Sequence, residues 1–211
     1  MSSVTDPSAT HPQPPAAPRR PACGWIMLAR HGEPALSRKI RLDASGYRDW
    51  WARYEEGGIR TDQNPPMGLL DMARQADVIF ASTRRRAIET AEAVVQGKHF
   101  VRDTVFIEAP LPPPPLPAFV RLNPRTWGFI SRVAWWFFGH NEGQETRREA
   151  EARAREVARR LMDAALSGQN VLVLAHGFFN TMVGRELRRA GWRNVEGRGY
   201  RYWSARRFER P

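Results

Sequence analysis

Four short apolar runs, separated by polar and helix-forming stretches, constrain the fold of this chain most. They read WIMLA, DVIFA, TVFI and NVLVLA and occupy residues 25–29, 77–81, 104–107 and 170–175. Apolar runs of this length, bounded by polar residues, predict strands that are buried on both faces of a sheet. Because helical patterns alternate with them, we expect an α/β fold, a three-layer sandwich with a mostly parallel central sheet and helices on both faces.

Several of the intervening segments carry helix signals. Residues 83–97 have an apolar stripe at helical spacing and end in glycine. Thr146 and Glu149 form a capping box that predicts the start of a longer helix. Residues 44–58 are expected to be a third helix, and the alternating segment 200–208 an edge strand.

The charge balance is strongly basic, with 33 Lys and Arg residues against 22 Asp and Glu residues and a formal net charge of +11. Such a bias can mark nucleic-acid binding. Here the basic residues alternate with acids, and the long helix carries pairs at i,i+4 with the acid first: Glu149–Arg153, Glu151–Arg155 and Glu156–Arg160. We therefore expect solvated helix faces and no nucleic-acid partner, although the net field would attract anionic substrates.

The chain divides into two parts by composition. Residues 1–22 are rich in Pro, Ala, Ser and Thr and predict a disordered tail. Residues 23–211 have the length of one domain. The one cysteine, Cys23, rules out an intramolecular disulfide and favours a reducing compartment, so we expect a cytoplasmic protein. The apolar run 25–29 leads into Arg-His without a small-residue cleavage site, so we expect no export signal.

Each apolar run is followed by polar residues that can do chemistry. In chain order these are Arg30-His31-Gly32, the segment from Ser82 to Arg86, Glu108, and His176-Gly177. Ligands of open α/β sheets bind outside the carboxyl ends of the strands. We therefore expect two histidines, at least two arginines and one carboxylate to meet at one edge of the sheet.

These residue types suit a phosphoryl group. Arginine donates planar, bidentate hydrogen bonds to phosphate oxygens, and glycine permits close approach of the backbone. A neutral imidazole is a nucleophile towards phosphorus, and nearby arginines would lower its pKa and keep it neutral. A carboxylic acid can supply the proton that a leaving alkoxide needs.

Three motifs in this order, LARHGE, STRRRAIETAE and VLAHG, resemble those of the histidine phosphatase superfamily, also called phosphoglycerate-mutase-like or RHG proteins. Arg84 stands where the second motif usually has leucine. The resemblance runs from about Gly24 to the carboxyl end and is loose over residues 38–76 and 109–143. The positions that match the second motif are Ser82, Arg86, Ala87, Thr90 and Ala91.

The resemblance implies a role for each matching residue. His31 would be the nucleophile that becomes a phosphohistidine, and Glu108 would be the proton donor, with Glu33 and Asp103 as the alternatives. Neither a metal nor a cofactor would be needed. The phosphate would be bound by Arg30, Gly32, Ser37, Arg86, His176 and Gly177.

The expected activity is therefore metal-independent hydrolysis of a phosphomonoester. A mutase of the same superfamily is an alternative, disfavoured because such enzymes are longer through the middle of the domain. A non-catalytic anion-binding module is the other alternative. The substrate would be a small phosphate ester, with a phosphoprotein possible, and the sequence says nothing of the oligomeric state.

Three segments near the expected site allow further predictions. Residues 109–119, APLPPPPLPAF, predict a stiff spacer that shapes a pocket rim. Residues 133–138, VAWWFF, are either part of a helix packed over the sheet or an apolar substrate lip or membrane patch. We favour the first and expect no membrane-surface contact. The helix opening at Gly177 could offer its N–H groups to an anion, or Phe178 and Phe179 could simply pack.

Overall fold

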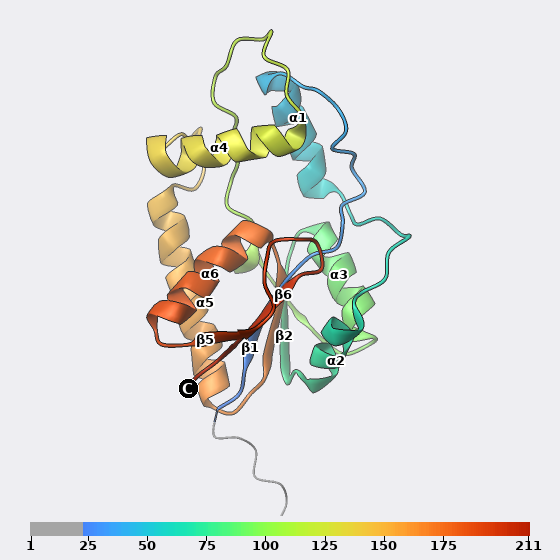
Figure 1. Cartoon of the computed structure of the whole chain (residues 1–211), viewed down its shortest axis with the longest axis vertical. Helices are drawn as coiled ribbons and strands as arrows, with labels where there is room; N and C mark the ends of the chain where they lie inside the picture. Colours follow the sequence, from blue (N-terminus) through green and yellow to red (C-terminus); the bar gives the residue numbers. More distant parts are fainter. Residues whose placement is uncertain (1–22) are drawn as a thin grey trace, which may run out of the picture.

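The computed structural model describes residues 23–211, so the predicted tail, residues 1–22, lies outside the described part. The described chain contains a six-stranded sheet with the strand order β3-β2-β4-β1-β6-β5 (Figure 1). Four strands run parallel: β1 (Ile26–Arg30), β2 (Val78–Ser82), β3 (Val101–Asp103) and β4 (Val171–Ala175). The strand β6 (Ala205–Glu209) runs antiparallel to both its neighbours, β1 and β5 (Arg193–Glu196).

Helices cover both faces of this sheet. The helices α5 (Arg147–Leu166) and α6 (Gly177–Arg189) pack on one face, against Ile26, Leu28 and Val173 among others. The helices α2 (Met67–Gln75) and α3 (Arg85–Val95) pack on the other, against residues that alternate with these in the same strands, such as Met27 and Leu172. Every residue of β4 is buried, which explains why its sequence is continuously apolar. The predicted three-layer α/β sandwich is confirmed.

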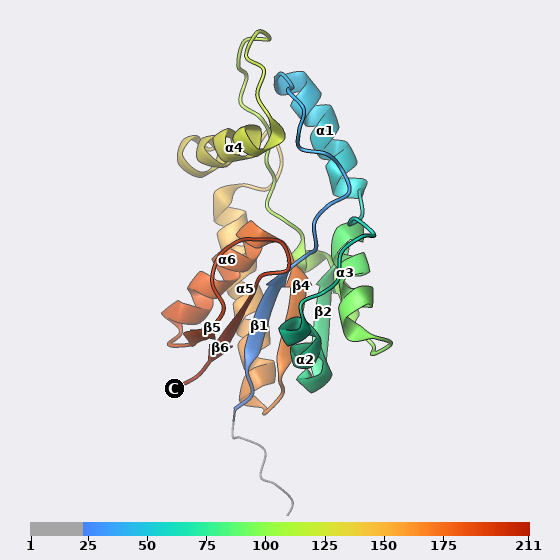
Figure 2. The same ribbon diagram turned by 45° about the vertical axis from the view of Figure 1, so that its right-hand side comes forward.

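Two further helices, α1 (Ala44–Glu56) and α4 (Pro124–Phe138), lie beyond the carboxyl ends of the parallel strands (Figures 1 and 2). Their own aromatic core consists of Tyr47, Trp50, Tyr54 and Trp127. The indole of Trp127 donates to the carbonyl of Leu42 at 2.6 Å, so its polar edge is satisfied inside this cluster. We call these two helices the cap.

Two strand predictions were wrong. Residues 104–107 are not a strand: β3 ends at Asp103, whose side chain accepts from the N–H of Val105 and caps a short 3₁₀ turn, η1 (Thr104–Phe106). The segment 200–208 was expected to be an edge strand, but β6 lies inside the sheet. The edge strand on this side of the sheet is β5, which is exposed throughout and has too few apolar residues to be recognised.

The capping box of α5 is confirmed, since Thr146 and Glu149 exchange both bonds. The predicted i,i+4 ion pairs on this helix are not formed. Arg153 instead binds Glu145 at 2.6 Å, and Arg160 binds Asp103 at 2.6 Å. Glu145 lies just before the helix and Asp103 ends β3, whereas the i,i+4 pairs that α5 does form have arginine first, Arg147–Glu151 and Arg159–Asp163.

The segment 133–138 is helical, as favoured, but it belongs to the cap and lies above the sheet edge rather than over a sheet face (Figure 1). Trp135 is buried in the core beside Ala109, whereas Phe137 and Phe138 are 72% and 79% exposed. Between residues 23 and 211, no helix is long and apolar enough to cross a bilayer.

Candidate active site

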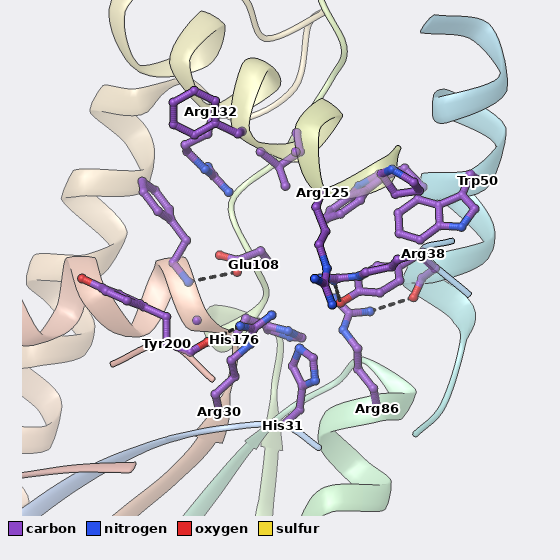
Figure 3. A pocket seen from close by; sticks show the side chains of 18 of the residues that line it. Arg30, His31, Arg38, Trp50, Arg86, Glu108, Arg125, Arg132, His176 and Tyr200 are labelled. Atoms are coloured by element: carbon purple, nitrogen blue, oxygen red, sulfur yellow. Dashed lines mark hydrogen bonds between the residues drawn. The ribbon is translucent and has the colours of Figure 1, made fainter. Parts of the chain in front are cut away.

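Two histidines stand together where β1 and β4 end. The register pairs Arg30 with Ala175, and the N–H of His31 donates to the carbonyl of Ala175 at 3.0 Å. His31 directly follows β1, and His176 directly follows β4. Both side chains are buried, and their ring centroids are 5.2 Å apart (Figure 3). Parallel pairing of the two strands therefore brings together residues 145 positions apart in the chain.

The hydrogen bonds of the two rings are different. The Nδ1 atom of His31 lies 2.7 Å from the carbonyl oxygen of Gly32. Since a carbonyl only accepts, Nδ1 carries the proton and Nε2 keeps its lone pair. His176 has its Nε2 atom 2.8 Å from the hydroxyl of Ser82, while its Nδ1 atom is buried without a partner.

Both imidazoles are held in the neutral form. Burial is the main cause that lowers the pKa of His31 well below its ordinary value of 6.5, and Arg86 and Arg30 lower it further. The pKa of His176 is lowered in the same way by burial, then by Arg86 and His31. A charged imidazole here would lose its hydration and face guanidinium groups.

Arg30 and Arg86 approach the histidines from two elements. Arg30 stacks 4.4 Å from the ring centroid of Tyr202 and donates to the carbonyl of Tyr200. Arg86, on α3, is buried and binds Glu55 at 2.7 Å. Both guanidinium groups keep a buried Nε atom that has no partner. Each guanidinium group is thus oriented by contacts with the protein and retains one N–H donor at Nε.

Glu108 lies between the sheet and the cap. Its carboxylate accepts from the N–H groups of Phe178 and Phe179, at 3.1 and 2.8 Å, in the first turn of α6. Of the two alternatives for this helix start, the N–H groups of Phe178 and Phe179 are therefore not open to a ligand anion, because they donate to a carboxylate of the protein. Arg153 fixes the preceding turn by donating to the carbonyls of Val105 and Ile107.

A cavity of about 350 Å³ opens above the histidines. Its floor is formed by His31, His176, Arg30, Arg86, Glu108 and Gly177. Its roof comes from the cap and from Arg38 in the loop before α1. The roof residues, none of which belongs to the three motifs, are Arg38, Tyr47, Trp50, Tyr54, Arg125, Phe129 and Arg132. Leu111 also lines the cavity, which places the start of the proline-rich segment at its rim, as predicted.

Ser37 does not line this cavity. It is exposed in a neighbouring hollow, where its hydroxyl accepts from the N–H of Lys39. Of the alternative acids, Glu33 lies in that same hollow near Arg60, and Asp103 binds Arg160. Among the three candidate proton donors, Glu108 is the one that lines the cavity.

The two glycines serve protein packing. A Cβ atom on Gly32 would lie 2.5 Å from the indole of Trp203, and one on Gly177 would lie 3.2 Å from the side chain of Arg30. Gly177 lines the cavity, whereas Gly32 is covered by Trp203 and donates its N–H to Thr90. The small residue beside each histidine therefore makes room for a side chain of the protein, and Gly177 also lies where a ligand could approach its backbone.

Metal ligands do not gather near the histidines. Within residues 23–211, no group of three His, Cys, Asp or Glu side chains is placed to hold a metal ion. Metal independence itself stays a prediction for experiment.

Comparison with solved structures identifies the fold. A mycobacterial glucosyl-3-phosphoglycerate phosphatase is 19% identical with a TM-score of 0.51, over 78% of this chain and 79% of that one. "Mycobacterial hydrolase 1" is 19% identical with a TM-score of 0.52, over 78% of both chains. A phosphoserine phosphatase from Entamoeba histolytica, in complex with 3-phosphoglyceric acid, is 13% identical with a TM-score of 0.50, over 79% of this chain and 80% of that one.

The chain has the histidine phosphatase fold. The likeness is structural, since no protein-family model and no curated protein matches the sequence. The fold implied by the three motifs is therefore confirmed, while the roles of the individual site residues rest on the geometry above.

The neutral histidines predict how stability depends on pH. Below pH 6.5 each of these histidines binds a proton in the unfolded chain but stays neutral in the folded chain. The free energy of unfolding therefore falls as the pH falls. Each of His31 and His176 should contribute a slope of about 1.4 kcal/mol per pH unit. Urea unfolding at pH 7 and pH 5 should show this loss, and the double variant His31→Gln, His176→Gln should lose less. An equal loss in both proteins would contradict the assignment.

Proposed function

We propose that this chain is a histidine phosphatase that hydrolyses small phosphate monoesters through a phosphohistidine on His31. The observation that carries the proposal is the state of that imidazole. His31 is neutral, its Nδ1 proton is held by the carbonyl of Gly32, and Nε2 keeps its lone pair. Around it stand a second neutral imidazole and two guanidinium groups, in a cavity of the size of a small metabolite.

In the first step, Nε2 of His31 attacks phosphorus and the bond from phosphorus to the ester oxygen breaks. Glu108 in its acid form gives its proton to that oxygen, so the product leaves as an alcohol and Glu108 is left as the carboxylate that the N–H groups of Phe178 and Phe179 stabilise. The Nδ1 proton stays on His31, and the carbonyl of Gly32 stabilises the positive charge that develops on the ring.

In the second step, water attacks the phosphohistidine. The Glu108 carboxylate takes a proton from the water as the new bond to phosphorus forms and the P–N bond breaks. Inorganic phosphate leaves, and both His31 and Glu108 return to their starting forms.

The remaining side chains of the floor stabilise charge on the transferring group. Arg30 and Arg86 carry free Nε donors, and His176 carries a buried Nδ1 atom without a partner. Donors that are already oriented in a cavity with little water stabilise developing charge without having to reorganise. We propose no metal or cofactor in these steps.

Two other functions differ from hydrolysis in the product that they would give. A mutase would return the phosphoryl group to a sugar acid, and an anion-binding module would not turn over at all. Phosphatases are among the structures with the same fold, and two of them are named for the small molecules glucosyl-3-phosphoglycerate and phosphoserine. These names support a small-molecule substrate over a phosphoprotein.

We further propose that residues 23–211 are one catalytic domain and that the protein is cytoplasmic.

The first test is hydrolysis of p-nitrophenyl phosphate in excess chelator. The wild-type chain should be active, and His31→Ala should reduce kcat by at least about a thousandfold, because the nucleophile is gone. The exposed His99 gives a matched control, and His99→Ala should keep wild-type activity. Activity that survives in His31→Ala, or that disappears with chelator, would contradict the mechanism.

Leaving-group dependence tests Glu108. Glu108→Gln should lower kcat/KM, which reports the first step, about a hundredfold or more for alkyl phosphates, whose alkoxides need a proton. The loss of kcat/KM on p-nitrophenyl phosphate should be only a few-fold, because nitrophenolate leaves without a proton. Comparable losses on the two classes of substrate would remove Glu108 from the role of proton donor.

A further inference from the structure

The cavity holds more positive charge than one phosphoryl group requires. Five arginines line it, against Glu108 as its one lining carboxylate: Arg30, Arg38, Arg86, Arg125 and Arg132. The proposed reaction uses the two on the floor. The other three belong to the roof, above the position of the transferring phosphoryl group.

Arg132 is a roof arginine whose hydrogen bonding is incomplete. Its Nη1 atom is buried and has no partner among the described residues, and its Nη2 atom reaches the carbonyl of Ala109 only at 3.4 Å. Its guanidinium carbon lies over the ring of Phe178, 3.6 Å from the ring centroid. None of the described carboxylates lies within ion-pair distance of it.

A guanidinium in this position is destabilised by its surroundings. Burial lowers the pKa of Arg132 to about 10, and the nearby charge of Glu108 opposes that shift only in part. A desolvated cation with an open donor costs free energy unless an anion pairs with it. Helix α4 could have carried a leucine here, so an unpaired arginine on the roof suggests a ligand group.

Figure 3 shows Arg132 reaching down from α4 towards Glu108 and the histidines. A phosphate ester seated on the floor would extend its leaving group towards this side chain. We propose that Arg132 forms a second anion subsite, and that the substrates are small phosphate monoesters whose leaving group carries a carboxylate or a second phosphate. The inference rests on the proposed function for the orientation of the substrate.

Arg132 could instead act only on Glu108, by stabilising its ionised form. That role and the subsite differ in their kinetics. A subsite residue changes binding or KM for substrates that carry the second anion and leaves the others unaffected. A residue that acts through Glu108 changes kcat for every alkyl phosphate.

The experiment compares ligands that differ in one group. The pair 3-phosphoglycerate and glycerol 3-phosphate exchanges a carboxylate for a hydroxymethyl group. The pair fructose 1,6-bisphosphate and fructose 6-phosphate exchanges a second phosphate for a hydroxyl. Binding to the His31→Ala protein is measured by calorimetry, with and without Arg132→Met. Arg121→Met, which removes an exposed arginine outside the cavity, is the charge-matched control.

We expect the doubly anionic member of at least one pair to bind about tenfold or more tightly than its partner. Arg132→Met should abolish that advantage, and Arg121→Met should keep it. Equal binding within both pairs would overturn the subsite, and this comparison needs no change at Arg132. An advantage that survives Arg132→Met would also overturn it, as would a uniform loss of kcat on alkyl phosphates when Arg132→Met is made in the protein that keeps His31.

An experiment can contradict the anion subsite without contradicting the proposed function, and the reverse also holds. Selective binding without hydrolysis of any of the four esters would support the subsite and contradict the proposed function. Hydrolysis of esters without selectivity would support the function and contradict the subsite.

Discussion

The parallel pairing of β1 with β4 is the contact on which the site depends. The hydrogen bond from His31 to the carbonyl of Ala175 continues the strand ladder by one residue and brings two imidazoles within 5.2 Å of each other. Apolar residues bury the strands that lead to them, and the same burial keeps both rings neutral. The core that stabilises the fold therefore also sets the protonation state of the proposed nucleophile. Arginines above the strand ends add to the effect and supply the donors that an anionic ligand needs.

The floor of the site could be predicted from the sequence because it follows from local patterns. Apolar runs identify parallel strands, and residues after their carboxyl ends must meet at one edge. Glu108 reached that edge although its strand was misplaced, since a 3₁₀ turn capped by Asp103 carries the chain from β3 to the site. The glycines also have a packing role that the sequence does not reveal. Their lack of a side chain accommodates Trp203 and Arg30, which are distant in sequence and could not be inferred from the motif.

The roof could not be predicted in this way. It depends on aromatic side chains from α1 and α4, about eighty positions apart, which form a separate core above the sheet. In a chain with 33 basic residues, no local signal separates Arg132 from the arginines on solvated faces. What distinguishes Arg132 is tertiary: a buried Nη1 atom without a partner among the described residues and a guanidinium carbon over the ring of Phe178. The proposed chemistry thus lies at the sheet edge and can be inferred from motifs, whereas the proposed second anion subsite lies in the cap.

The central claim is transfer of the phosphoryl group to one nitrogen atom of one histidine. Rapid mixing of the wild-type chain with p-nitrophenyl phosphate, quenching in alkali within the first turnover, would preserve a phosphohistidine. Peptide mass spectrometry would locate the group, and ³¹P NMR of the denatured protein would distinguish the two ring nitrogens. The account predicts phosphorylation of His31 at Nε2, because Nδ1 is held by Gly32. A phosphoryl group on His176 or on Nδ1 of His31, or turnover without any phosphorylated residue, would contradict it.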